Sequence, residues 1–222
     1  DYTVAYDKDD FKNVTGTIKV TITGKGNYEG EVIREYQITK RTVTLKSADL
    51  SKSYDGTELV NGETALETET GWADGEGATY TFTGSQTKVG NSANTFTYTL
   101  NNGMKAGNYT ITKTEGTLTV TAKSVSGMKV DKPSNQQYDG KEHKWEPTVQ
   151  DGEKTLEKGT DYTVAYNKSD FTNVTGTIKV TITGKGNYEG EVIREYKITK
   201  RTVTLKSADL SKSYDGTELV NG

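Results

Sequence analysis

Few residues in this chain could do chemistry, and most of those are carboxylates and aromatic rings. The 222 residues include one histidine, no cysteine, 2 tryptophans and 14 tyrosines, with 31 Asp plus Glu against 28 Lys plus Arg. Without cysteine there is no thiolate ligand or disulfide, and a single histidine excludes a multi-histidine zinc or iron site. A metal would need oxygen ligands, and we expect no cofactor.

The acidic run Asp7-Lys8-Asp9-Asp10 is the best candidate for a calcium loop, because extracellular modules bind Ca²⁺ through carboxylate oxygens. Asp74 with Glu76 is a weaker candidate. The chain provides its own control, since the equivalent later loop reads Asn167-Lys168-Ser169-Asp170 and keeps only one carboxylate. We therefore expect no metal site and no metal requirement for folding.

Trp72 and Trp145 are the candidate ligand-binding residues, because a flat ring can stack on a sugar while neighbouring polar groups bind its hydroxyls. Trp72 lies in a loop-like stretch and is expected to be the more exposed, whereas Trp145 precedes an expected strand. The alternative for both is a place in the core, where tryptophan is usual in small β domains. His143 has no Ser, Cys or Asp at an informative spacing, so we expect an ordinary surface histidine. No carboxylate pair stands out from surface charge, and we expect no enzyme.

A Tyr-Asp-Gly triplet is the most repeated local feature. It occurs as Tyr54-Asp55-Gly56, Tyr138-Asp139-Gly140 and Tyr214-Asp215-Gly216. The pattern predicts a structural turn in which Asp accepts backbone hydrogen bonds, Gly takes positive φ and Tyr packs at the edge of the core. The alternative is a phenol and a carboxylate presented to a ligand. It is disfavoured because the residues that follow the first two triplets differ, Thr57-Glu58-Leu59 against Lys141-Glu142-His143.

These residues belong to a chain with two levels of repetition. Residues 1–62 and 161–222 are identical at 58 of 62 positions, so the period is 160 residues, and the triplets divide each period into two units. We expect the C-terminal part of a second-type unit at 1–40, a complete first-type unit at 41–122, a complete second-type unit at 123–200, and the N-terminal part of another first-type unit at 201–222.

Alternation of apolar residues with threonine predicts strands rather than helices, since 38 residues are Thr and β-branching favours the pleated backbone. The alternating runs are 80–83, 95–100, 109–112, 117–120, 162–166 and 177–183. Gly-rich turns separate them, and no stretch has a helical apolar period. The expected fold is all-β, with tandem small antiparallel β domains, each a sandwich or a β-grasp-like sheet.

Charge and hydropathy exclude two classes of partner. The net charge of −3 gives no basic field for nucleic acid. No apolar run approaches the roughly 20 residues of a membrane span, so membrane insertion is not expected.

The joint between two repeat units contains no Gly, Ser or Pro spacer, because Ile198-Thr199-Lys200 runs directly into Arg201-Thr202-Val203. We therefore expect adjacent repeats to lie end to end in a monomeric rod on the order of 100 Å long, at about 3.3 Å per strand residue.

The second-type unit resembles the MBG and YDG repeats of bacterial surface proteins. The likeness rests on Tyr138-Asp139-Gly140-Lys141, on Thr155 to Val164 and on Thr181 to Tyr188. The first-type unit looks like a sister type, through Tyr54-Asp55-Gly56-Thr57 and Ala106 to Ile111. The resemblance covers nearly the whole chain and implies a large, extracellular, cell-wall-associated Gram-positive protein. In such proteins these repeats form stalks or adhesive regions, some described as mucin-binding, and the resemblance implies no catalytic residue.

Together these features predict a non-catalytic stalk segment that holds a distal binding region away from the cell. Near-identical copies 160 residues apart suit an array that sets length better than they suit a unique active site. The alternative is a multivalent adhesin module that binds mucin or another host glycan weakly and gains avidity from repetition.

Overall fold

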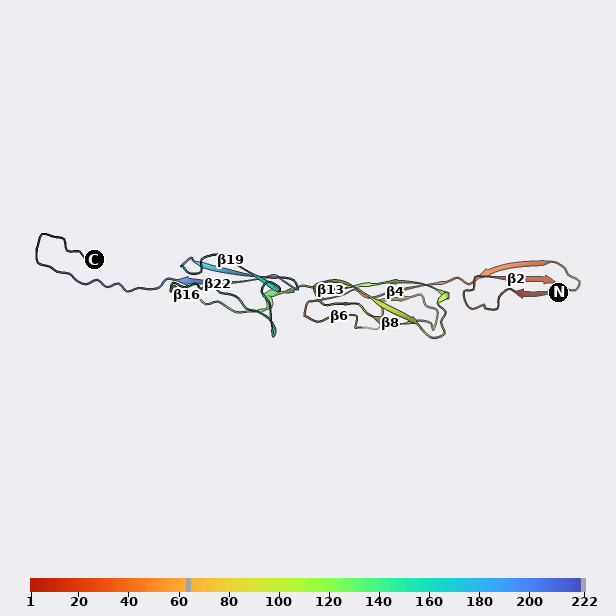
Figure 1. Ribbon diagram of the computed structural model, residues 1–222. Coiled ribbons are helices and arrows are strands. Elements are labelled where there is room, and N and C mark those ends of the chain that lie inside the picture. The colour runs from red at the N-terminus through yellow and green to blue at the C-terminus, as the bar shows by residue number, and fades with distance from the viewer. Residues whose placement is uncertain (63–64, 221–222) are drawn as a thin grey trace. The chain divides into compact units, whose positions relative to one another are not determined.

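The computed structural model describes residues 1–62 and 65–220 and divides the chain into two compact units. The first unit is Asp1–Lys123 with Gly186–Tyr188, and the second is Ser124–Lys185 with Glu189–Gly222. Among the described residues the only helices are two three-residue 3₁₀ turns, η1 (Ala106–Asn108) and η2 (Val125–Gly127). The chain is all-β (Figure 1). Each alternating run named above overlaps a strand.

In the first unit, residues 1–40 form one antiparallel sheet in the order β1-β2-β3. Its strands are β1 (Tyr2–Tyr6), β2 (Thr17–Gly24) and β3 (Glu31–Gln37). The register places Tyr2 opposite Gly24 and Ile18 opposite Tyr36. Alternation puts Ile18, Val20 and Ile22 on one face of the central strand, with Thr and Lys side chains on the other.

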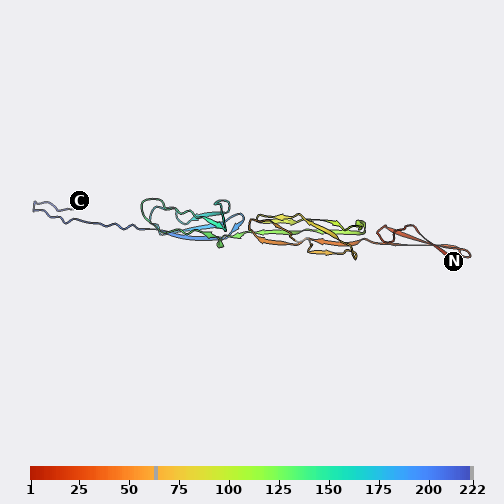
Figure 2. The same ribbon diagram turned by 90° about the horizontal axis from the view of Figure 1, so that it is seen from below.

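The described residues between 41 and 123 of the same unit form four small sheets, whose strands run alongside one another in Figure 2. The first has the order β12 (Tyr109–Thr114), β4 (Arg41–Lys46), β7 (Thr68–Thr70). The second has the order β10 (Gly90–Asn94), β13 (Gly116–Thr121), β5 (Leu50–Ser53). The other two are strand pairs, β8 (Ala78–Phe82) with β11 (Phe96–Leu100) and β6 (Leu59–Val60) with β9 (Ser85–Gln86).

The core of residues 41–123 lies between the β12-β4-β7 sheet and the β8·β11 pair. Val43 and Leu45 of β4, Phe96 of β11 and Tyr109 of β12 are buried there. Thr42 and Thr44 alternate with the two buried apolar residues of β4 and are more accessible. The alternation of apolar and polar residues in the sequence thus gives the strand one buried face and one more exposed face.

The second unit holds a four-stranded sheet and a three-stranded sheet. The larger has the order β16 (Gln136–Gln137), β22 (Glu191–Thr199), β20 (Thr177–Gly184), β19 (Tyr162–Tyr166). The smaller has the order β15 (Lys129–Val130), β17 (Val149–Asp151), β18 (Lys154–Thr155). Two short strands, β14 (Lys123–Ser124) and β21 (Tyr188–Glu189), lie where the chain passes from one unit to the other. A core cluster forms from Phe171, Ile178, Val180, Tyr196 and Ile198.

The strand pairs formed by residues 1–62 and 65–220 include three parallel ones, where the sequence predicts only antiparallel sheets. They are β4 with β12, β5 with β13 and β16 with β22. Apolar and polar residues alternate in the same way in both kinds of ladder, so the period cannot reveal strand direction. The long connections that parallel pairing requires are present, because more than 50 residues separate the two strands of each pair.

Residues 201–220 form no strand, although residues 41–60 have the same sequence and form β4, β5 and β6. In the first unit, β4 pairs with β12 and β7, while β5 pairs with β13. These strands therefore depend on pairing partners far along the chain.

Candidate functional site

The three Tyr-Asp-Gly triplets share one local geometry. Their glycines have φ of +82° at Gly56, +83° at Gly140 and +73° at Gly216. In each triplet an Asp Oδ1 accepts a hydrogen bond from the backbone N–H two residues on, at 2.8 Å (Thr57), 2.9 Å (Lys141) and 2.9 Å (Thr217). The carboxylates are therefore engaged in holding the turns.

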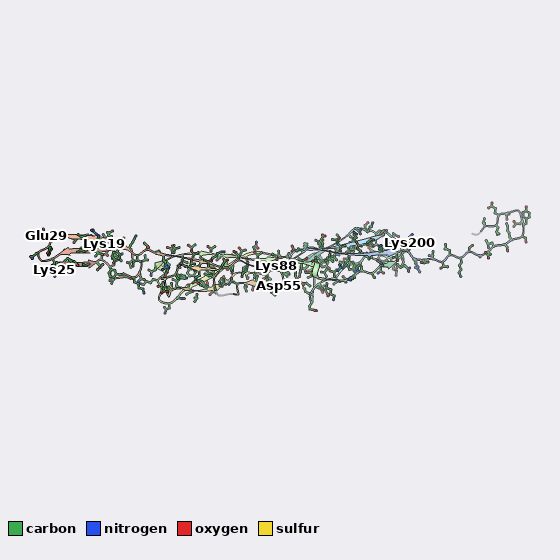
Figure 3. All side chains as sticks on the ribbon, turned by 180° about the vertical axis from the view of Figure 1, so that it is seen from behind. Lys19, Lys25, Glu29, Asp55, Lys88 and Lys200 are labelled. Carbon is green, nitrogen blue, oxygen red and sulfur yellow. The ribbon has the colours of Figure 1, made fainter. Side chains whose placement is uncertain are left out.

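Lys52 adds a second constraint to the first turn. Its Nζ donates to Asp55 Oδ1 at 2.8 Å and to the Thr57 carbonyl at 2.7 Å, and the Thr57 hydroxyl also donates to Asp55 Oδ1 at 2.8 Å. The Lys52 ammonium and the Thr57 N–H hold the pKa of Asp55 far below its ordinary value. Figure 3 labels Asp55, which accepts these hydrogen bonds.

The tyrosines of the triplets do not share one environment, contrary to the expectation of a common place at the core edge. Tyr54 packs edge-on against Tyr188 with ring centroids 5.5 Å apart. Tyr138 is 39% exposed and Tyr214 is 98% exposed. The turn geometry is local to Asp and Gly, whereas the burial of Tyr depends on what else packs nearby.

His143 has a carboxylate partner, which corrects the expectation of an unpartnered surface histidine. Its Nε2 lies 2.8 Å from Asp139 Oδ1, across the second Tyr-Asp-Gly turn. The Lys141 N–H, followed by His143, lowers the pKa of Asp139. The only sign of this pair in the sequence is that an Asp and a His stand four residues apart. Their side chains meet because the chain turns between them.

Trp72 is half-buried and packs against the core of residues 41–123. Its ring meets Tyr109 edge-on with centroids 5.0 Å apart, and its indole N–H donates to Glu69 Oε1 at 2.9 Å. The ring fills the edge of the core and satisfies its polar atom internally. It does not form the exposed platform that its loop context suggested.

Two glutamates beside Trp72 accept hydrogen bonds from tyrosine hydroxyls. Tyr80 donates to Glu69 Oε1 at 2.6 Å, and Tyr109 donates to Glu76 while accepting from the Ala73 N–H at 3.2 Å. Burial and then the Glu69 contact raise the pKa of Tyr80 to about 12. Burial likewise raises the pKa of Tyr109. Glu76, one of the weaker calcium candidates, is thus bonded within the fold.

Trp145 is also half-buried, and it packs against the core cluster of the second unit. Its backbone N–H donates to the Tyr196 hydroxyl at 3.3 Å, and the Tyr166 hydroxyl donates to its carbonyl at 2.8 Å. Trp145 lines a surface hollow of about 350 Å³, together with Lys132, Pro133, Ser134, Gln136, His143, Lys144 and Tyr196. An aromatic wall with a polar rim is the kind of surface that could receive a sugar ring.

Two carboxylates of the acidic loop of residues 7–10, those of Asp7 and Asp10, accept backbone hydrogen bonds. Asp7 Oδ1 accepts from the Lys19 N–H at 2.7 Å, and in the second copy Asn167 Oδ1 accepts from the Lys179 N–H at the same distance. A neutral amide oxygen fills this role as well as a carboxylate does, which explains why Asn can replace Asp here. The position requires an acceptor and not a charge.

Asp10 closes the same loop. Its Oδ1 accepts from the backbone N–H groups of Lys12 and Asn13, both at 3.0 Å, and Asp170 does the same for Thr172 and Asn173 in the second copy. The hydrogen bonds from Asn13 hold the pKa of Asp10 far below its ordinary value. Within residues 1–62 and 65–220, no group of three or more His, Cys, Asp or Glu is arranged to hold a metal ion.

Searches for relatives add no family or function to this geometry. No helix in the described part of the chain is long and apolar enough to cross a membrane. No protein-family model, curated protein or solved structure matches the chain.

Proposed function

We propose that this chain is a non-catalytic stalk segment of a bacterial surface protein, which holds a distal binding region away from the cell wall. The observation that carries the proposal is that the side chains most able to do chemistry are bonded within their own fold. Asp10, Asp55 and Asp139 each accept backbone hydrogen bonds, and Trp72 and Tyr80 share Glu69. This use of polar groups suits a scaffold.

The repetition supports the same proposal. Residues 1–62 and 161–222 differ at only four positions, and two of these, Asp7 to Asn167 and Gln37 to Lys197, leave the strand registers of the two sheets the same. An array whose task is length needs each copy only to fold. The resemblance to MBG and YDG repeats supports a cell-wall-associated, extracellular setting for such an array.

Surface display tests the stalk directly. The chain is fused between an N-terminal epitope tag and a C-terminal wall anchor on a Gram-positive cell, with one or two additional 160-residue periods in parallel strains. A stalk predicts that bead-bound antibody, which is too large to enter the wall, captures cells more efficiently with each added period. Capture that does not change with the number of periods, at equal display measured with free antibody fragment, would contradict the proposal.

The hollow beside Trp145 favours one second candidate, a weak glycan-binding module. Its aromatic wall and the polar side chains of Ser134, Gln136 and Lys132 could hold a sugar ring. A glycan array probed with the multimerised chain tests this candidate. Binding that is lost in Gln136→Ala, where the core cluster is untouched, would support an adhesin, and no binding above the background of an unrelated β domain would reject it.

A further inference from the structure

A Gly-Asn-Tyr triplet recurs in the chain, and its asparagine belongs to none of the turns or cores described above. The triplet stands at residues 26–28, 107–109 and 186–188, all within the first unit. In the last two the tyrosine is buried, with Tyr109 5% and Tyr188 3% exposed. Asn108 and Asn187 beside them are half-buried. A buried tyrosine anchors each of these two triplets, so the neighbouring asparagine is presented from a fixed position.

Asn108 contacts residues 1–40 from the turn η1, which leads into β12. Its Oδ1 accepts a hydrogen bond from the Val14 N–H at 2.9 Å, and its Nδ2 donates to Asn13 Oδ1 at 2.9 Å. We name these two hydrogen bonds the Asn108 contact. β1-β2-β3 is a separate sheet from those of residues 41–123. The Asn108 contact therefore connects these two parts of the first unit through a side chain.

Asp10 sets the orientation of the Asn13 amide. Its Oδ1 and Oδ2 accept from Asn13 Nδ2 at 3.0 Å and 2.8 Å, and Oδ1 also accepts from the Asn13 N–H at 3.0 Å. Because the amide nitrogen is held by the carboxylate, the amide oxygen faces Asn108 and requires a donor there. Val14 requires an acceptor. The carboxamide of Asn108 meets both requirements at once, whereas a carboxylate would meet only one.

Asn187 makes the same kind of hydrogen bond with a different segment. Its Oδ1 accepts from the Val89 N–H at 3.0 Å, and its backbone carbonyl accepts from the Lys123 N–H at 3.0 Å. Val89 lies between β9 and β10. Asn108 and Asn187 thus each accept a backbone N–H from a residue that belongs, by the unit boundaries expected from the sequence, to the preceding repeat.

We propose that the asparagine of the Gly-Asn-Tyr triplet is the interaction site through which a repeat binds the repeat before it. The partner is a turn that presents a backbone N–H. Recognition of the main chain allows one asparagine position to bind Asn13-Val14 in one repeat type and Lys88-Val89 in the other. The joint is then held by side chains as well as by chain continuity. This recognition goes beyond the stalk proposal and does not depend on it.

Amide hydrogen exchange in the full chain, measured residue by residue by NMR, tests the proposal. In Asn108→Ala the Val14 amide should exchange about tenfold faster, because its acceptor is gone, while the Val89 amide should not change. In Asn187→Ala the Val89 amide should exchange faster by a similar factor, while Val14 should not change. Each variant is the matched control for the other. Unchanged exchange at Val14 and Val89 in their respective variants would overturn the proposal, as would release of both amides by either variant.

Asn108→Asp tests the carboxamide itself. The variant keeps an acceptor for the Val14 N–H but cannot donate to Asn13 Oδ1 at neutral pH. We expect the Val14 amide to exchange faster than in the parent chain, because the Asn108 contact needs both hydrogen bonds. Val14 exchange at the parent rate would contradict the two-sided recognition of Asn13 and Val14.

Backbone ¹⁵N relaxation shows whether the contact holds the joint. In the parent chain, amides of β2 and β4 should report the same rotational correlation time, and in Asn108→Ala the value for β2 should fall below that for β4. Equal values in the variant would overturn the proposal. Slow exchange at Val43 and Leu45 checks that the variant still folds. Where it does not, Asn13→Ala breaks the contact from the other side, and the same fall at β2 is expected.

Failure of this proposal and failure of the stalk proposal are distinguishable. An array with freely bending joints also gains length with each added period, so the display experiment on cells does not depend on the Asn108 contact.

Discussion

Single residues in this chain show how acidic side chains can serve structure alone. Asp55, Asp139 and Asp215 each cap a turn whose glycine has positive φ, and Asp7 accepts a hydrogen bond that Asn167 accepts equally well in the other copy. A loop in which Asn can replace Asp needs a hydrogen-bond acceptor at that position and does not need a negative charge. Acidic clusters in a sequence therefore say little about metal until their backbone partners are known.

Gly140 offers a clean test of the turn geometry. A Cβ at this position would meet no atom within 4 Å, so Gly140→Ala acts only through the backbone at φ +83°. We expect a loss of about 1 kcal/mol in the unfolding free energy. Gly127→Ala in the same unit is the control, because its φ lies outside the left-handed region and its Cβ also meets nothing. Urea unfolding followed by Trp145 fluorescence measures both, and equal costs would contradict the assigned turn.

Tyr80 predicts how stability changes at high pH. Its pKa is about 12 in the fold and about 10 in an unfolded chain, so the folded state keeps the proton more strongly. This contribution is complete below pH 10 and is lost as the pH rises from about 10 to 12. Tyr80→Phe should flatten that part of the stability curve for the first unit. A curve of unchanged slope in the variant would show that Tyr80 does not supply the linkage.

At the scale of elements, two copies of one sequence show which structures depend on nearby residues and which depend on distant ones. Residues 41–60 and 201–220 have one sequence, yet only the first forms strands. The turn survives in both, with Lys212 Nζ at 2.8 Å from Asp215 Oδ1 as Lys52 Nζ is from Asp55 Oδ1. Turn geometry therefore needs only a few neighbouring residues, whereas a strand needs its partner.

Ser47 and Ser207 turn this contrast into a measurement. Ser47 is fully buried, donates to the Asn94 carbonyl at 2.6 Å and accepts from the Gly116 N–H at 2.9 Å. Ser47→Ala leaves both groups buried without that partner and should cost about 1–3 kcal/mol. Ser207→Ala, at the same sequence position in the exposed copy, should stay within about 0.5 kcal/mol.

Chemical unfolding of the first unit, read by Trp72 in a Trp145→Phe background, measures Ser47→Ala, and unfolding of the second unit, read by Trp145 in a Trp72→Phe background, measures Ser207→Ala. Similar effects of the two substitutions would contradict the view that distant partners give Ser47 its role. The two backgrounds separate the two units, each of which contains one tryptophan.

The sequence predicts strands and turns well here because their patterns are local. The Thr alternation at 177–183 becomes β20, and that at 109–112 becomes the start of β12. It does not predict the parallel pairing of β4 with β12, because both directions have the same period. It also misses the contact of His143 with Asp139, since that contact depends on how the chain folds back around a turn.

At the scale of the whole molecule, the central claim is that repetition sets length. Spacer-free joints predict that successive repeats extend along one line, and the strand arithmetic predicts a rod on the order of 100 Å. A multivalent adhesin would require the repeats to be accessible but would not require a particular length. The dimensions of the chain in solution therefore distinguish the stalk from the adhesin.

Small-angle X-ray scattering on the full chain is the most direct measurement. A thin rod on the order of 100 Å long has a radius of gyration of about 30 Å, and the stalk proposal predicts a value near this. A compact globule of 222 residues would have a radius of about 17 Å. A value close to the compact figure, at concentrations where the chain is monomeric, would contradict the stalk and shift the weight to a compact binding module.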